Sequence, residues 1–273
     1  MTAAASAAAA PPEVPVVPTR RVLGVDLAAT DYEDAMDAMD AMVERRARGY
    51  VCAVATHAVM VAQDDPEMHA ALSGSTLTVP DGMPLVWAMN ALGETLEDRV
   101  YGPDLMLRYT ERCARRGHRV YLYGGRDERA LADLTDNLGR RFGGLDVVGG
   151  YSPPFRALTP DEEDQVVAGI EAARPDVLWV GIGVPKQEKW MHRMRPRLEV
   201  PVMCAVGAAF DFHAGLVAQA PPWLQRRGLE WLYRVTREPR RLGPRYLRYN
   251  PRFAVGAARQ VARARLRGGG PPP

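Results

Sequence analysis

The run from Leu178 to Trp190, LWVGIGVPKQEKW, is the part of this sequence whose residue types point most directly to chemistry. It is typical of a buried strand, a glycine turn and a helix that opens on a proline. In open α/β sheets, ligands bind beyond the carboxyl ends of the strands, and the free N–H groups at a helix start favour an anion such as a diphosphate. Lys186 and Gln187 in the first turn of this helix are therefore candidate ligand contacts. The alternative interpretation of this segment alone is an ordinary crossover without a ligand.

Polar residues also follow three other apolar segments: Thr56 with His57, Asp81 in a Pro-Asp-Gly-Met-Pro turn, and Asp211 between two phenylalanines. Because the carboxyl ends of parallel strands converge on one edge of a sheet, these residues could share a cleft. The Asp81 carboxylate could take a proton from an incoming hydroxyl, a role worth about 10²–10⁴ in rate. The competing interpretation of Asp81 is a helix N-cap, where aspartate is also favoured. His57 is more simply explained as an ordinary polar residue at a strand end.

Arg99 lies in a glycine-containing loop and could bind a phosphate through its planar guanidinium group, although a surface position is the simpler explanation for one loop arginine. No D-x-D motif occurs, so the usual carboxylate pair that holds a metal on a nucleotide diphosphate is missing, and we expect neither a metal nor another cofactor. The dinucleotide fingerprint G-x-G-x-x-G is also absent, since Lys186 stands where its third glycine would be. This weakens a nicotinamide- or flavin-dependent function.

The elements that must position these residues alternate between strand and helix from Tyr50 onward. This alternation predicts an α/β fold with a mostly parallel, Rossmann-like sheet and helices on both faces. Several strand candidates are apolar at nearly every position, as expected for strands covered on both sides. The strand candidates are Val22–Leu27, Tyr50–Ala55, Thr76–Val79, Arg119–Tyr123, Leu145–Val148, Asp176–Val180 and Pro201–Val206; helices are expected at Tyr32–Arg48, Asp104–Arg116, Glu128–Phe142, Pro160–Ala173 and Pro185–Arg195.

After Asp211 the alternation stops and the chain becomes basic. The 273 residues carry a net charge of only +2, but residues 223–267 contain thirteen arginines and two glutamates, which leaves 22 basic and 31 acidic side chains before them. Such asymmetry indicates a charged partner. The spacing predicts helices at Trp223–Arg237 and Arg245–Arg267, broken at Pro239 and Pro244 and interrupted at Pro251.

Five arginines of this basic segment recur at spacings of three and four and should align on one bent helical face. Together with the aromatic residues between them, they would suit the headgroup region of an anionic membrane. The alternative is a surface helix whose arginines pair with the acidic body. The five are Arg234, Arg237, Arg241, Arg245 and Arg248.

The expected domain plan has four parts: a disordered Ala/Pro-rich tail at 1–18, an α/β catalytic domain at 19–220, a basic helical appendage at 221–267 and a disordered tail at 268–273. No apolar run reaches the ~18 residues of a membrane-spanning helix, and residues 1–18 lack the pattern of a signal peptide. The three cysteines have no metal-like spacing and are expected to be small buried hydrophobic residues in a reducing cytosol. Asp34, Asp37 and Asp40 should form a solvated helix face.

Taken together and in this order, several motifs resemble those of the WecG/TagA/CpsF glycosyltransferases, glycosyltransferase family 26. The resemblance covers roughly Val22 to Phe253. The motifs are Thr56, Pro80-Asp81-Gly82-Met83, Arg99-Val100-x-Gly102-x-Asp104-Leu105, Tyr151-Ser152-Pro153-Pro154-Phe155, Val180-Gly181-x-Gly183-x-Pro185-Lys186-Gln187-Glu188, Ala208-Ala209-Phe210-Asp211-Phe212-x-Ala214-Gly215, Gly228-Leu229-Glu230-Trp231-Leu232-Tyr233-Arg234 and Glu238-Pro239-x-Arg241.

The resemblance implies inverting transfer of a sugar, as in an N-acetylmannosaminyltransferase, from a UDP-sugar to an undecaprenyl-diphosphate-linked sugar. The product would serve teichoic acid, capsule or exopolysaccharide synthesis. The resemblance makes Asp81 the general base, puts Thr56, Arg99 and Gln187 in the substrate pocket, and has the appendage bind the membrane and complete the site. His57 stands where the family often has asparagine, and Leu216 replaces a common basic residue.

The expected location is therefore peripheral, on the cytoplasmic face of the cell membrane, with a homo-oligomer compatible and no nucleic-acid partner. Two other functions stay open from the residues themselves. One is a Rossmann-type nucleotide-dependent oxidoreductase, which the missing fingerprint disfavours. The other is a non-enzymatic membrane- or nucleic-acid-binding module, which would leave the polar residues at the strand ends unexplained.

Overall fold

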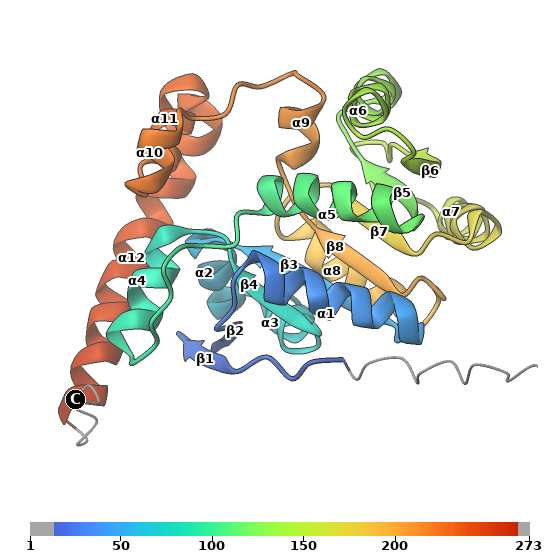
Figure 1. The fold of residues 1–273 in the computed structure, drawn as a ribbon. Helices are drawn as coiled ribbons and strands as arrows, with labels where there is room; N and C mark the ends of the chain where they lie inside the picture. The colour runs from blue at the N-terminus through green and yellow to red at the C-terminus, as the bar shows by residue number, and fades with distance from the viewer. Residues whose placement is uncertain (1–13, 267–273) are drawn as a thin grey trace, which may run out of the picture.

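A six-stranded sheet with the order β4-β3-β8-β7-β5-β6 forms the centre of the molecule, and each neighbouring pair is parallel. The structure, a computed structural model, describes residues 14–266 (Figure 1). The predicted α/β fold with a mostly parallel sheet is confirmed. The strands are β3 (Gly49–Val54), β4 (Leu77–Pro80), β5 (Arg119–Gly124), β6 (Asp146–Tyr151), β7 (Val177–Gly181) and β8 (Val202–Ala205).

Helices cover both faces of this sheet, and successive side chains of each strand enter opposite layers. In β7, Trp179 packs into one apolar cluster, whereas Leu178 and Val180 pack into the other. Figure 1 shows α1 and α5 in front of the sheet and α2, α3 and α8 behind it. The helices of the first cluster are α1 (Tyr32–Arg45), α5 (Gly102–Arg116), α6 (Glu128–Arg141) and α9 (Ala209–His213); those of the second include α2 (Thr56–Asp64), α3 (Pro66–Ser73), α4 (Met83–Ala91), α7 (Pro160–Ala173) and α8 (Lys186–Met194).

The predicted strand Val22–Leu27 is wrong in form, because the structure has an antiparallel hairpin of β1 (Thr19–Val22) and β2 (Val25–Ala28). Leu23 and Gly24, at φ +47° and +83°, make the turn between the strands. A two-residue turn of this hand matches the twist of a hairpin. Upstream, Val14 and Val17 pack against the core and the Pro18 carbonyl accepts from the Ala29 N–H at 2.8 Å, so the predicted disorder of residues 1–18 is wrong for residues 14–18. Residues 1–13 and 267–273 of the predicted tails lie outside the described part.

The basic segment forms α10 (Pro222–Arg226), α11 (Glu230–Arg237) and α12 (Pro239–Leu266). Pro239 begins α12, as a proline at a first helical position can. The predicted breaks at Pro244 and Pro251 are wrong, because α12 continues through both. Each internal proline costs about 3 kcal/mol locally. Burial of Leu242, and of Phe253 within the core of the body, contributes in the opposite direction. Figure 1 shows α12 along one side of the molecule, with α10 and α11 beside its first half.

The structure also tests the predictions for the three cysteines and for the end of one strand. Cys52, Cys113 and Cys204 are free and buried, as predicted. The predicted end of the strand candidate Leu145–Val148 is wrong, because β6 continues through Gly149 and Gly150 to Tyr151. Within residues 14–266, no helix combines the length and apolar character needed to cross a membrane.

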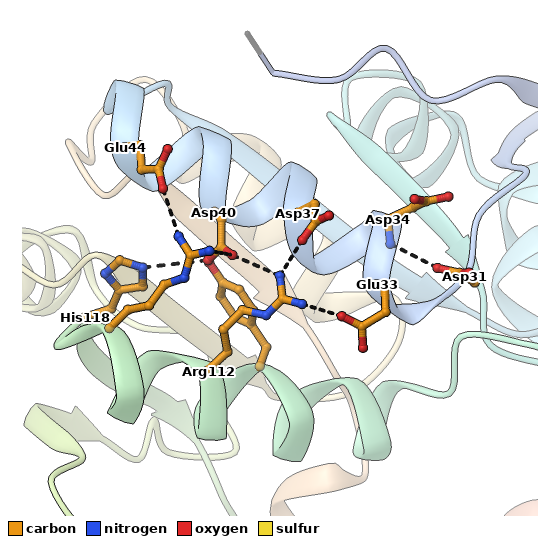
Figure 2. A network of polar contacts seen from close by, with 10 residues as sticks. Asp31, Glu33, Asp34, Asp37, Asp40, Glu44, Arg112 and His118 are labelled. Atoms are coloured by element: carbon orange, nitrogen blue, oxygen red, sulfur yellow. Dashed lines mark hydrogen bonds and ion pairs between the residues drawn. The ribbon is translucent and has the colours of Figure 1, made fainter. Parts of the chain in front are cut away.

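Asp40 of α1 belongs to a polar network between α1 and α5, shown in Figure 2. Its side chain is 6% exposed, so the prediction of a solvated face is wrong for Asp40, although Asp37 at 62% does face solvent. Arg112 and Arg116 lie 2.9 and 3.2 Å from Asp40 Oδ2, and the Tyr109 hydroxyl donates to Oδ1 at 3.1 Å. Burial alone would raise the pKa of Asp40, but His118 and Arg112 outweigh it and hold that pKa below its usual value.

Replacing Asp40 by asparagine should therefore destabilise the fold, because two arginines lose a buried counter-charge. We expect the free energy of unfolding to fall by about 3 kcal/mol in a urea titration. Asp37→Asn is the matched control, since its exposed pair with Arg112 should contribute at most ~1 kcal/mol. Equal losses in the two variants would contradict a special role for the buried aspartate.

Candidate functional site

A cavity of about 1860 Å³ opens at the carboxyl ends of the parallel strands. Its walls come from the sheet edge, the first turns of α2 and α8, and the appendage helices α11 and α12. The structure thus brings together all the polar residues that the sequence placed at strand ends and helix starts. Thr56, His57, Asp81, Arg99, Lys186, Gln187 and Asp211 all line the cavity.

Asp81 directly follows β4 and is held by the backbone on two sides. Its N–H donates to the carbonyl of Val54 at 2.8 Å, and its Oδ1 accepts from the N–H of Gly102 at 2.7 Å. Helix α4 begins after Gly82 without a side-chain cap, so the N-cap alternative is wrong for the adjacent helix. The carboxylate instead meets the start of α5. Burial raises the pKa of Asp81 to about 6, with the cation of Arg99 acting in the opposite direction.

Arg99 lies beside Asp81 and forms a buried ion pair with Glu230. The simpler explanation of a surface arginine is therefore wrong. Nη2 of Arg99 donates to Glu230 Oε2 at 2.7 Å, and both side chains are 9% exposed. Nη1 donates to the backbone carbonyl of Asp81 at 3.2 Å, and the guanidinium lies 4.1 Å from the ring centre of Tyr101. The predicted phosphate contact of Arg99 stays a prediction.

Glu230, the first residue of α11, is a site residue that the sequence reasoning did not single out. Its second oxygen, Oε1, accepts from the Tyr101 hydroxyl at 2.6 Å. It is one of only two acidic residues among thirteen arginines in residues 223–267, and that exception to the charge pattern could have marked it. A buried carboxylate in a basic segment needs a specific cationic partner, and here that partner is in the body.

Thr56 and His57 form the start of α2 and face the appendage. Thr56 Oγ1 lies 3.4 Å from Oδ1 of Asn250 in α12, and the His57 ring meets Tyr249 edge-on with 5.0 Å between centres. Burial, with a smaller contribution from Arg245, lowers the pKa of His57 to about 3, so the imidazole is neutral at physiological pH. A neutral ring packed on an aromatic residue acts here as part of the wall between body and appendage.

Gln187 and Lys186 have different environments although they are neighbours in α8. Gln187 is buried, and its Oε1 accepts from the Gly183 N–H at 3.2 Å while its Nε2 donates to Glu188 Oε1 at 2.9 Å. Its amide therefore secures the glycine turn. Burial raises the pKa of Glu188 to about 7. Lys186 is exposed at the first position of the helix, where its ammonium group can reach a ligand in the cavity.

Asp211 in α9 is bound to Arg126, a cavity residue that the sequence reasoning missed. Nε and Nη2 of Arg126 donate to the two carboxylate oxygens at 3.0 and 3.2 Å. The two opposite charges largely cancel at this part of the cavity wall. Within residues 14–266, no three His, Cys, Asp or Glu side chains are grouped so that they could hold a metal ion.

The arginines of the basic appendage differ in their surroundings, and their alignment on one bent face stays a prediction. Arg234 of α11 and Arg245 of α12 line the cavity. Arg237 and Arg248 are exposed, and Arg248 lies 3.8 Å from Asp64 of α2. Glu238 lies between α11 and α12 and interrupts the helical spacing of the arginines. For Arg241, only the backbone is described.

Comparison with known proteins connects this geometry with a chemistry. The family model described as the glycosyl transferase WecG/TagA/CpsF family matches residues 20–267, from β1 to the end of α12, so both sheet and appendage are included. The N-acetylglucosaminyldiphosphoundecaprenol N-acetyl-beta-D-mannosaminyltransferase of Bacillus spizizenii is 30% identical over 180 residues, which cover 66% of this chain and 68% of the relative. These matches exclude the oxidoreductase and the non-enzymatic binding module considered from the sequence.

Proposed function

Because this chain belongs to the WecG/TagA/CpsF family of glycosyltransferases, we propose that it transfers a sugar from a UDP-sugar to a sugar on a polyprenyl diphosphate, with inversion at the anomeric carbon. By similarity to the named activity of the Bacillus relative, the sugar is N-acetylmannosamine and the acceptor is N-acetylglucosaminyl-diphosphoundecaprenol. The product would enter teichoic acid or another cell-surface polymer. The observation that carries the proposal is the half-buried carboxyl group of Asp81, which lines the strand-end cavity with a raised pKa.

Asp81 is proposed as the general base. With a pKa of about 6 it is mostly ionised at neutral pH, yet it is more basic than an exposed aspartate and takes up a proton more readily. The acceptor hydroxyl would give its proton to the carboxylate while its oxygen attacks the anomeric carbon. The bond from that carbon to the UDP oxygen breaks on the opposite face, which inverts the configuration, and UDP leaves with the bonding electrons.

The negative charge that develops on UDP needs compensation, and the cavity offers it near α8. Lys186 lies exposed at the first position of that helix, whose N-terminus carries a partial positive charge. Preorganised charges of this kind stabilise a transition state without being rearranged during the reaction. The Arg99 guanidinium is already bound to Glu230. Arg99 is therefore proposed to contribute positive potential to the cavity without binding the leaving UDP directly.

The appendage is proposed to hold the lipid-linked acceptor at a membrane. Arg234 and Arg245 line the cavity and would bind the acceptor diphosphate, and the exposed Arg237 and Arg248 would face anionic headgroups. Each arginine near an anionic leaflet contributes about 1 kcal/mol. The protein would therefore act on the cytoplasmic face of the membrane as a reversibly bound enzyme.

Asp81→Asn should lower kcat for sugar transfer by about 10²-fold or more, because the amide cannot accept the proton. Binding of UDP and the midpoint of thermal unfolding should change little. The matched control is Asp136→Asn, which removes an exposed carboxylate on α6 outside the cavity. A folded Asp81→Asn enzyme with normal turnover would remove Asp81 from the reaction.

The pH dependence of transfer follows from the same group. Below a pH of about 6 the carboxyl becomes protonated and loses its capacity as a base, so kcat/KM should fall about tenfold per pH unit there and level off above it. Initial rates between pH 4.5 and about 8 measure this limb, and a limb near the ordinary aspartate value of about 4 would contradict a raised pKa.

Removing the outer arginines should weaken membrane binding while leaving the cavity intact. The double variant Arg237→Gln, Arg248→Gln should lose about 2 kcal/mol, or ~30-fold in partition coefficient, on vesicles containing phosphatidylglycerol. The matched control is Arg115→Gln, Arg129→Gln, which removes two exposed arginines from α5 and α6. Equal sedimentation of the two double variants with vesicles would exclude the proposed orientation.

A further inference from the structure

Glu230 has both carboxylate oxygens bound by residues of the α/β body. Oε2 accepts from Arg99 Nη2 at 2.7 Å and Oε1 accepts from the Tyr101 hydroxyl at 2.6 Å. Glu230 is 7% exposed. The other charged side chains described in the appendage are half-buried or exposed. The Glu230 carboxylate of α11 thus connects the appendage with the segment of residues 99–102 through an ion pair and a hydrogen bond.

The segment held by Glu230 is the one that contacts Asp81. Arg99 Nη1 donates to the Asp81 carbonyl at 3.2 Å, and the N–H of Gly102 donates to Asp81 Oδ1 at 2.7 Å. Between them, the backbone N–H of Tyr101 donates to the Tyr32 hydroxyl at 3.0 Å, which ties the segment to α1. Glu230 is therefore connected to Asp81 in two ways: through Arg99, which donates to the Asp81 backbone carbonyl, and through Tyr101, whose neighbour Gly102 donates to the Asp81 carboxylate.

We infer that Glu230 is a positioning residue, which holds Arg99 and Tyr101 so that Asp81 keeps its place and its basicity only while α11 is docked on the body. This inference rests on the proposed role of Asp81 as the base. The appendage would then do more than carry the enzyme to its acceptor, because docking of α11 would also complete the environment of the base.

The charges around Asp81 give the direction of the effect. Arg99 from the loop before α5 and Arg234 from α11 both lower its pKa, whereas Glu230 from α11 raises it and burial raises it most. Removing the charge of Glu230 takes away one raising influence. It also releases Arg99 from its ion pair, so that the guanidinium is free to interact more strongly with Asp81. Both changes lower the pKa of Asp81.

The test follows the Gly102 amide by nuclear magnetic resonance, because its N–H is bonded to Asp81 Oδ1 and its chemical shift reports ionisation of that carboxyl. In the full-length wild type the titration midpoint should lie near pH 6. Glu230→Gln should move the midpoint to lower pH. Asp64→Asn is the matched control, since it removes the exposed Arg252 pair at 2.7 Å between α12 and α2 and should leave the midpoint unchanged. An identical midpoint in wild type and Glu230→Gln would overturn the inference.

Transfer kinetics supply the second readout. Glu230→Gln should lower kcat by up to about 10²-fold, as expected when a catalytic group is displaced by about an ångström, and should leave KM for the UDP-sugar nearly unchanged. Tyr101→Phe removes one hydrogen bond and keeps the ion pair, so it serves if Glu230→Gln does not fold, and it should show a smaller fall in kcat. Unchanged kcat in both variants would overturn the inference. A wild type without transfer activity would refute the proposed function instead, while the amide titration would still decide whether Glu230 controls Asp81.

Discussion

A buried ion pair between Arg99 and Glu230 is the interaction on which the arrangement of this site depends. Removing two charges from water is costly, and the cost is offset only where further hydrogen bonds satisfy the remaining donors and acceptors. Here the Tyr101 hydroxyl and the Asp81 carbonyl supply those bonds. The partners are 131 positions apart in the chain, so the pair fixes the basic appendage as a wall of the cavity.

Asp40 and Asp81 show how the surroundings of a carboxyl group determine its chemistry. Asp40 is buried beside His118, Arg112 and Arg116, which hold its pKa below the usual value and make it structural. At Asp81 the main lowering influence, Arg99, is shared with Glu230 and Arg234 contributes less, so burial dominates and the pKa of Asp81 rises. Only the second arrangement leaves a carboxyl group suited to exchanging a proton near neutral pH.

The charge asymmetry of the chain has two outcomes in the folded molecule. Part of it is used within the structure, since Arg252 pairs with Asp64 of α2 and Arg99 of the acidic body pairs with Glu230 of the basic appendage. Of the other arginines, Arg234 lines the cavity and Arg237 is exposed. Pairing with the acidic body is therefore present in part of the segment, whereas membrane binding by its other arginines stays a proposal.

By itself, the sequence determined the parallel α/β sheet and the gathering of polar residues at its carboxyl edge. Strand periodicity is local, and the topology of parallel strands brings their ends together whatever the details of packing. Tertiary structure alone decided that α12 continues through Pro244 and Pro251, that Asp40 is buried, and that Glu230 reaches Arg99. Each of these depends on contacts between elements distant in the chain, where packing energy outweighs local propensity and a spacing of three or four residues does not reveal which side of a helix will be covered.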